Sequence, residues 1–186
     1  HYVKRCVASA GDTLEIRNGD VYVNSQAQEI WPGVQNSYTV ITNGQKINPK
    51  NLEKMGINTA ELMYDPSLPG YRAMPLTAKM LETVRTYSNV DTVMQNIDTY
   101  PADYPDSYLT IFPFTADYKW TRDNFGPLWI PSKGATVQLT TGNLPLYERI
   151  ITSYEGHALE VKDGVIGWNN KFCRIESAIH IGNASR

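Results

Sequence analysis

Histidine and cysteine are scarce in this chain, and their positions exclude several kinds of site. The 186 residues contain three histidines and two cysteines. Cys6 and Cys173 lie near opposite ends, with no Cys-x-x-Cys or Cys/His spacing, which excludes a disulfide scaffold and a zinc knuckle. The Gly-x-Ser-x-Gly, His-Glu-x-x-His and glycine-rich phosphate-binding motifs are also missing. We therefore expect neither histidine-based catalysis nor a bound metal or other cofactor.

Long apolar runs and an excess of positive charge are absent as well. No stretch approaches the roughly 18 consecutive apolar residues of a transmembrane helix, and the opening HYVKRCVASA lacks the pattern of a secretion signal. We expect any membrane anchor to lie outside these residues. Basic residues number 17 and acidic residues 19, for a net charge of −2, so nucleic acid is not an expected partner.

The composition is that of a folded domain. Hydrophobic residues make up 41% of the chain and charged residues only 19%, and there are 12 tyrosines. This balance excludes general disorder and favours a β-rich extracytoplasmic domain.

Two similar segments lie near opposite ends of the chain. GDTLEIRNGDVYVN at residues 11–24 and GHALEVKDGVIGWN at residues 156–169 share a frame of Gly-x-x-Leu-Glu followed by an apolar and a basic residue. Each contains an Asn-Gly or Asp-Gly dipeptide between alternating apolar residues, which predicts a β-hairpin with a type I′ turn. The pair suggests two halves of one β-core, although such hairpins are common enough for the similarity to be coincidental.

The composition between these segments changes, which predicts an insertion. We expect a mainly β fold: a β-core interrupted by a large inserted α+β cap. Residues 1–25 form the first part of the core, residues 26–145 the cap, and residues 146–166 the return to the core. Residues 167–186 are a tail without an assigned structure.

Helical periodicity is confined to the expected cap. Residues 49–63 and 75–97 are the helix-like stretches, with Leu76, Met80 and Val84 among the apolar positions at helical spacing. Residues 100–134 are rich in proline and aromatic residues, which predicts an irregular stretch packed by its rings, either lining a cleft or forming an extended cap. The alternation of residues 135–156 predicts a return to β-structure.

The first residues contain a lysine in a strand-like context. Lys4 lies within YVKRCV, where it is flanked by apolar and small residues and followed by a turn at Ala10-Gly11-Asp12. A Lys-Arg pair on a strand is usually a solvated edge. The other interpretation is that burial lowers the pKa of Lys4, so that its neutral amine acts as general base to a serine hydroxyl.

The segment YVKRCVASAGDTLEI, followed by NGDVYVN, resembles the lysine box and following hairpin of type I signal peptidases. Downstream, WTRDNFGPLWIPSKGATVQL and NLPLYERIITSYEGHALEVKDG are similar to family members with a large cap. The resemblance extends from Tyr2 to about Val165.

The resemblance implies a membrane-bound serine endopeptidase that removes signal peptides from exported preproteins with a Ser/Lys dyad. Lys4 is the implied general base. Tyr2 and Val3 match the strand that pairs with the extended substrate, and Arg5 matches the basic residue after the lysine. The implied location is the bacterial inner membrane, with the catalytic domain on the periplasmic side and the membrane segments outside this chain.

The sequence departs from the family pattern in three places. No Ser-x-Met-x-Pro nucleophile box precedes Lys4, no final box follows the second hairpin, and Ala10 replaces the usual proline. We expect a fragment that does not cleave peptides by itself, with Cys6 and Cys173 unbonded to each other. A β-rich binding or adaptor module and an inactive paralogue of a secretion complex remain alternatives.

Overall fold

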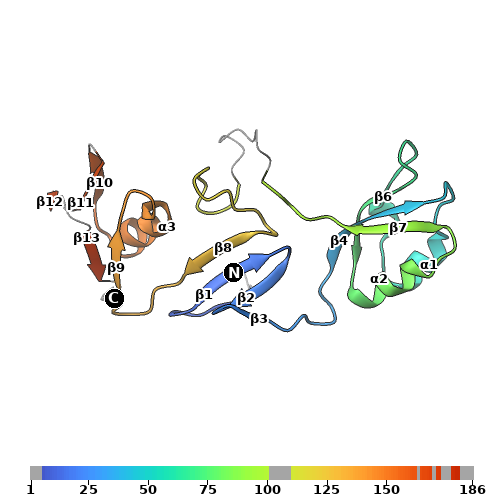
Figure 1. Cartoon of the computed structure of the whole chain (residues 1–186), viewed down its shortest axis with the longest axis horizontal. Coiled ribbons are helices and arrows are strands. Elements are labelled where there is room, and N and C mark those ends of the chain that lie inside the picture. Colours follow the sequence, from blue (N-terminus) through green and yellow to red (C-terminus); the bar gives the residue numbers. More distant parts are fainter. Residues whose placement is uncertain (1–5, 101–109, 163, 169–170, 173–176, 181–186) are drawn as a thin grey trace. The chain divides into compact units, whose positions relative to one another are not determined.

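The computed structural model describes residues 6–100, 110–162, 164–168, 171–172 and 177–180. Antiparallel strands predominate, which confirms the mainly β prediction (Figure 1). The contacts divide the chain into two compact units. We call residues 28–98 the inserted unit and residues 1–27 with 99–186 the split unit.

The inserted unit is a four-stranded antiparallel sheet with two short helices (Figure 1). The strand order is β5-β6-β4-β7. The elements, in chain order, are β4 Asn36–Thr42, α1 Pro49–Lys54, a 3₁₀ turn Thr59–Glu61, β5 Met63–Asp65, β6 Gly70–Leu76, α2 Ala78–Arg85 and β7 Val90–Gln95.

A single apolar core holds the inserted unit together. Leu52 of α1 and Val84 of α2 belong to the same buried cluster as Val40 and Met74 of the sheet, so both helices contribute to one core. The full cluster is Tyr38, Val40, Ile47, Leu52, Ile57, Tyr71, Met74, Leu76 and Val84. Burial of this apolar surface is the main stabilising contribution in the unit.

Both helices occur where periodicity predicts helix, but they are shorter than expected. Asn48 caps α1 and Thr77 caps α2, each through a side-chain oxygen that accepts a backbone N–H. The helical prediction is wrong after Arg85, because β7 follows and pairs with β4. Its β-branched Val90, Thr92 and Val93 suit a strand, and the pairing outweighs the weak helical spacing.

Among its described residues, the split unit contains three sheets and one helical segment. We call its first sheet, of strand order β3-β2-β1-β8, the lysine-box sheet. The elements are β1 Thr13–Arg17, β2 Asp20–Val23, β3 Gln26–Ala27, β8 Phe125–Trp129, β9 Thr136–Leu139, α3 Leu144–Arg149, a π-helical turn Ile150–Tyr154, β10 Leu159–Lys162, β11 Val165–Trp168, β12 Lys171–Phe172 and β13 Ser177–His180.

Both predicted hairpins are present. In the first, β1 pairs with β2, and the turn residues Asn18 and Gly19 have φ values of 51° and 88°, as a type I′ turn requires. In the second, β10 pairs with β11 around Gly164, whose φ is 76°. The two hairpins belong to the same unit but to different sheets, so the similar sequences do not form one continuous sheet among the described residues.

The second apolar cluster contains helical residues where the sequence predicted β-structure. Leu144, Tyr147 and Ile151 are buried at spacings of three and four, so one face of α3 and the π-helical turn packs on β9. The prediction of β-structure across residues 144–154 is therefore wrong. The sequence predicted no structure for the tail, residues 167–186, but this tail contains β12 and β13. Strand β13 pairs with β9.

The predicted cap and the inserted unit begin at nearly the same position in the sequence, but they end at different positions. The cap was expected to run from residue 26 to residue 145, whereas the inserted unit ends at Asp98. The described residues 99–100 and 110–145 belong to the split unit. The reason is β8, which pairs with β1 and so joins this stretch to the lysine-box sheet (Figure 1).

Candidate functional site

The predicted site residues Tyr2, Val3, Lys4 and Arg5 lie outside the described residues, so their predicted roles stay predictions. The description begins at Cys6, an exposed thiol whose Sγ donates to the carbonyl oxygen of Ala8 at 3.1 Å. Cys173 also lies outside the described residues, and the prediction about its pairing stays untested. The site is therefore built from the turn and strands that follow Lys4 directly.

A tight turn connects the lysine segment to β1. The N–H of Asp12 donates to the Ser9 carbonyl at 3.0 Å, and the Asp12 Oδ2 accepts the Ser9 N–H at 2.8 Å. Gly11 has a φ of 98°, a left-handed conformation that favours glycine. Ala10, which replaces the proline of the family pattern, is exposed in this turn.

Asn24 joins this turn to the end of β2. Its Nδ2 donates to the Asp12 Oδ1 at 2.8 Å, and its Oδ1 accepts the Thr13 N–H at 2.9 Å. The Ser9 N–H and then the Asn24 amide hold the pKa of the Asp12 carboxyl below its usual value. Asp12 is therefore a charged anchor of the turn rather than a proton donor near neutral pH.

The segment around β8 contacts β1 at both ends. Near the turn, the Gly11 N–H donates to the Ile130 carbonyl at 2.7 Å, and the Ile130 N–H donates to the Asp12 carbonyl at 2.8 Å. At the hairpin tip, the Asn18 N–H donates to the Asn124 Oδ1 at 3.1 Å and the Gly19 N–H to the Asp123 carbonyl at 2.9 Å. Residues 123–130 therefore add the strand β8 to the hairpin of β1 and β2.

Gly126 allows the backbones of β8 and β1 to approach each other closely. A Cβ at this position would lie 2.5 Å from the Leu14 carbonyl oxygen and 3.1 Å from the Glu15 Cα, and the φ of Gly126 is 88°. The register of β1 and β8 shifts at this point, between Leu14 and Ile16. Sequence reasoning assigned this stretch to the irregular cap, and the one local signal for a special strand was its Gly-Pro dipeptide.

The irregular stretch before β8 is packed by its rings, as predicted. The Trp120 ring lies 4.7 Å from that of Tyr118 and 4.5 Å from that of Phe125. The Tyr118 hydroxyl donates to the Gly142 carbonyl at 2.7 Å, which connects the stretch to the turn before α3. Burial raises the pKa of that hydroxyl, with a smaller contribution from the Asp117 charge.

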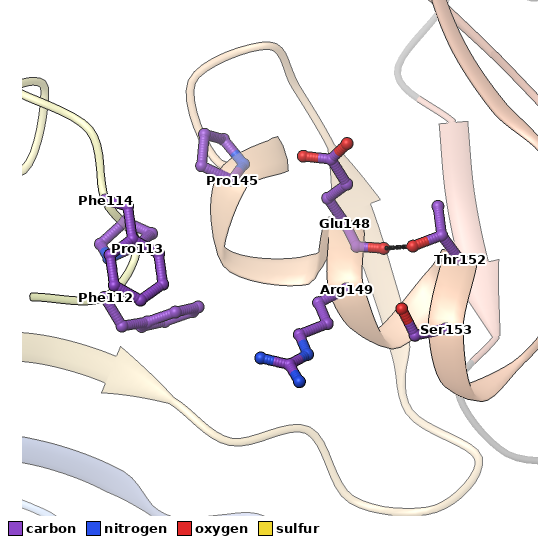
Figure 2. Close-up of a pocket in the computed structure, with 8 residues that line it drawn as sticks. All are labelled: Phe112, Pro113, Phe114, Pro145, Glu148, Arg149, Thr152 and Ser153. Atoms are coloured by element: carbon purple, nitrogen blue, oxygen red, sulfur yellow. Dashed lines mark hydrogen bonds between the residues drawn. The ribbon is translucent and has the colours of Figure 1, made fainter. Parts of the chain in front are cut away.

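A separate hollow lies between this stretch and the α3 segment (Figure 2). It has a volume of about 280 Å³ and is lined by Phe112, Pro113, Phe114, Pro145, Glu148, Arg149, Thr152 and Ser153. Figure 2 shows the Glu148 and Arg149 side chains pointing in different directions, and the Thr152 hydroxyl donates to the Glu148 carbonyl at 2.8 Å. This lining holds two hydroxyls and the Glu148 carboxylate, and it contains neither histidine nor lysine.

The described part of the chain contains neither a membrane-spanning helix nor a cluster of metal-binding side chains. None of its helices is both long and apolar enough to cross a bilayer. Across those same residues, no three histidine, cysteine, aspartate or glutamate side chains gather where a metal ion could bind.

In a comparison with known proteins, one family model matches both the lysine segment and most of the inserted unit. The family model described as "Signal peptidase, peptidase S26" matches residues 1–93. This match covers Lys4, the turn, the first hairpin and most of the inserted unit, and it ends before β8. No curated protein and no solved structure matched the chain.

Proposed function

We propose that this chain carries the general base of a type I signal peptidase. The premise is that the chain belongs to the signal peptidase family, peptidase S26. Membership of this family implies that the protein is a hydrolase with a signal peptidase-like function. The proposal adds the mechanism, the substrate and the place of action. The observation that carries it is the family match across residues 1–93, which includes Lys4 in its Tyr-Val-Lys-Arg segment.

In the proposed mechanism, the neutral amine of Lys4 accepts the proton of a serine hydroxyl that lies outside these 186 residues. The serine oxygen attacks the scissile carbonyl of the preprotein, and the departing amine of the mature protein takes the proton back. Lys4 then deprotonates a water that hydrolyses the acyl-enzyme. A lysine performs these steps only when it is neutral, which requires a site walled off from water.

The proposed substrate is the signal peptide of an exported preprotein, bound as an extended strand. Tyr2 and Val3 would contribute the main-chain hydrogen bonds of that strand pairing, and Arg5 is the basic residue that supports the lysine. The proposed location is the periplasmic face of the bacterial inner membrane, with anchoring segments outside these residues.

The test uses the full-length parent protein and a purified preprotein. We expect Lys4→Met, which keeps the length of the side chain and removes its amine, to lower cleavage at least about a hundredfold while the fold is kept. Lys50→Met is the matched control, because Lys50 is exposed at the start of α1. Cleavage by Lys4→Met close to that of the parent would place the base elsewhere.

The same assay separates the alternatives. The isolated 186 residues should not cleave the preprotein, because they contain no matching nucleophile box. A full-length parent that binds signal peptides without cleaving them would instead identify a binding module or an inactive paralogue.

A further inference from the structure

The helical segment formed by α3 and the π-helical turn has two faces with different surroundings. One face packs on β9, as described above. Pro145, Glu148, Arg149 and Thr152 follow one another at helical spacing, so they share a second face. All four line the hollow of about 280 Å³ (Figure 2). One wall of this hollow is therefore a helical face that the apolar core does not use.

The opposite wall is aromatic. The rings of Phe112 and Phe114 lie 6.2 Å apart in an edge-to-face arrangement, and Pro113 between them is buried. The bond from the Tyr118 hydroxyl to the Gly142 carbonyl connects this stretch to the turn before α3. The two walls therefore belong to one unit and are joined beside the hollow.

Phe114 has an unusual conformation for an apolar residue on the surface. Its φ is 62°, which bulky side chains rarely adopt, and its side chain is 60% exposed. The N–H of Phe114 donates to the Ile111 carbonyl at 2.8 Å, which closes the turn that holds the ring at the hollow. Backbone strain of this kind concentrates at sites that clamp a ligand.

The charged side chains of the hollow point apart. Figure 2 shows Arg149 extending on the side of Phe112 and Glu148 on the side of Pro145. Within the part of the chain that the structure describes, Arg149 forms no ion pair. Its guanidinium is therefore available to an anion that enters the hollow beside the aromatic wall.

We propose that this hollow binds an apolar carboxylic acid, with its carboxylate on Arg149 and its apolar group against Phe112 and Phe114. A planar guanidinium can donate two parallel hydrogen bonds to a carboxylate, and aromatic rings provide a surface for an apolar group. The volume is at the lower end of the range of small-molecule pockets, which suits a ligand about the size of one amino-acid residue.

The other charge in the lining narrows the class of ligand. The Glu148 carboxylate repels a second negative charge, so the hollow favours a carboxylate with one charge over a phosphate with two. The same chemistry is found in a free acid and in the carboxyl terminus of a peptide. The inference does not depend on the proposed role of Lys4.

The first experiment measures the binding of N-acetyl-phenylalanine to the full-length parent by NMR titration. We expect a Kd on the order of 1 mM, as suits so small a ligand. N-acetyl-phenylalaninamide has the same ring without the carboxylate and should bind at least about tenfold more weakly. Phenylpropanoate and a tripeptide that ends in phenylalanine distinguish the two sources, because the tighter binder identifies a free acid or a peptide terminus.

Substitutions assign this binding to the hollow. Arg149→Gln should weaken the binding of N-acetyl-phenylalanine at least about tenfold, because it removes the charge-assisted hydrogen bonds. Arg85→Gln is the matched control and should bind as the parent does, because Arg85 is also exposed in the last turn of a helix. Glu148→Gln should bind phenyl phosphate about tenfold more tightly than the parent, because the repelling charge is gone.

Phe114→Gly separates a role in binding from a role in folding. Glycine adopts a positive φ without strain, so the melting temperature should be at least that of the parent. Binding of N-acetyl-phenylalanine should weaken about fivefold, because the ring is lost. A lower melting temperature with unchanged binding would overturn the role of Phe114 and with it the inference.

The remaining outcomes also decide the inference. Binding that is weakened by the amide probe and by Arg149→Gln, but not by Arg85→Gln, supports it. The absence of chemical-shift changes at about 10 mM N-acetyl-phenylalanine overturns it. Binding that Arg149→Gln leaves intact also overturns it, because the ligand then lies elsewhere. A Lys4→Met variant that still cleaves would contradict the proposed function and would leave this result unchanged.

Discussion

The inserted unit and the lysine-box sheet are built by different means. The inserted unit buries nine residues in one cluster, and all of them come from the consecutive residues 28–98. The lysine-box sheet buries none of its strand side chains and joins residues 13–27 to residues 125–129 through hydrogen bonds. The comparison shows that an apolar core stabilises the inserted unit, whereas hydrogen bonds between strands join the parts of the lysine-box sheet.

The substitution with the largest expected effect on stability tests the apolar core of the inserted unit. Met74 is completely buried, and Met74→Ala should lower the free energy of unfolding of this unit by about 4 kcal/mol, because it removes apolar contacts and leaves a cavity. Met63→Ala is the matched control, because Met63 is 75% exposed, and it should change stability by less than about 0.5 kcal/mol.

Amide exchange assigns the Met74→Ala effect to one unit. The amides of β4 and β6 should lose protection, while those of β1 keep theirs. Equal loss of protection in β1 would contradict the comparison, because the two regions would then unfold together.

The substitution with the next largest effect on stability tests how closely the backbones of β8 and β1 approach in the lysine-box sheet. Gly126→Ala should cost about 3 kcal/mol, since a Cβ meets the Leu14 carbonyl and the backbone keeps a left-handed conformation. Gly134→Ala shares the positive φ but meets no atom within 4 Å, so it should cost only about 1 kcal/mol. Chemical denaturation of both variants measures the difference, and equal costs would show that β8 does not approach β1 this closely.

The smallest effect concerns two carboxylates, one in each region. The Ser67 hydroxyl and then Arg72 hold the pKa of Asp65 far below its usual value, and the Ser9 N–H and the Asn24 amide lower that of Asp12. A lowered pKa in the folded state adds stability above the unfolded pKa of about 3.9, and this stability disappears as the pH falls through the folded pKa.

Melting temperatures recorded from pH 5 downward test both carboxylates. Asp65→Asn should flatten the loss of stability in acid for the inserted unit, and Asp12→Asn should do so, more weakly, for the lysine-box sheet. An acid profile unchanged by Asp65→Asn would show that its bonds to Ser67 and Arg72 do not persist in solution.

The features predicted correctly depend on neighbours in the sequence. The Asn18-Gly19 turn follows from the need for two positive φ values, and the register of β1 with β2 follows from that turn. The start of α2 follows from its Thr77 cap and apolar spacing. These contacts join residues only a few positions apart, so their chemistry can be recognised before the fold is known.

The features missed depend on partners far along the chain. The spacing of Val90 and Val93 is compatible with a helix, and only pairing with β4 makes that segment a strand. The stretch from Phe125 to Trp129 contains a glycine and a proline, which argue against a strand until β1 is placed beside it. Asn124 has no motif of its own, and its bond to Asn18 joins residues 106 positions apart in the sequence.

The amino-acid sequence by itself determined the mainly β character, the two hairpins and the lysine segment that resembles the signal peptidase family. Each of these is set by local turn chemistry, alternation or a short run of residues. Only the tertiary structure decided where the insertion ends and which distant segment completes the lysine-box sheet. The reason is that backbone hydrogen bonds between strands are nearly independent of side-chain identity, so the choice of partner depends on the fold of the whole chain.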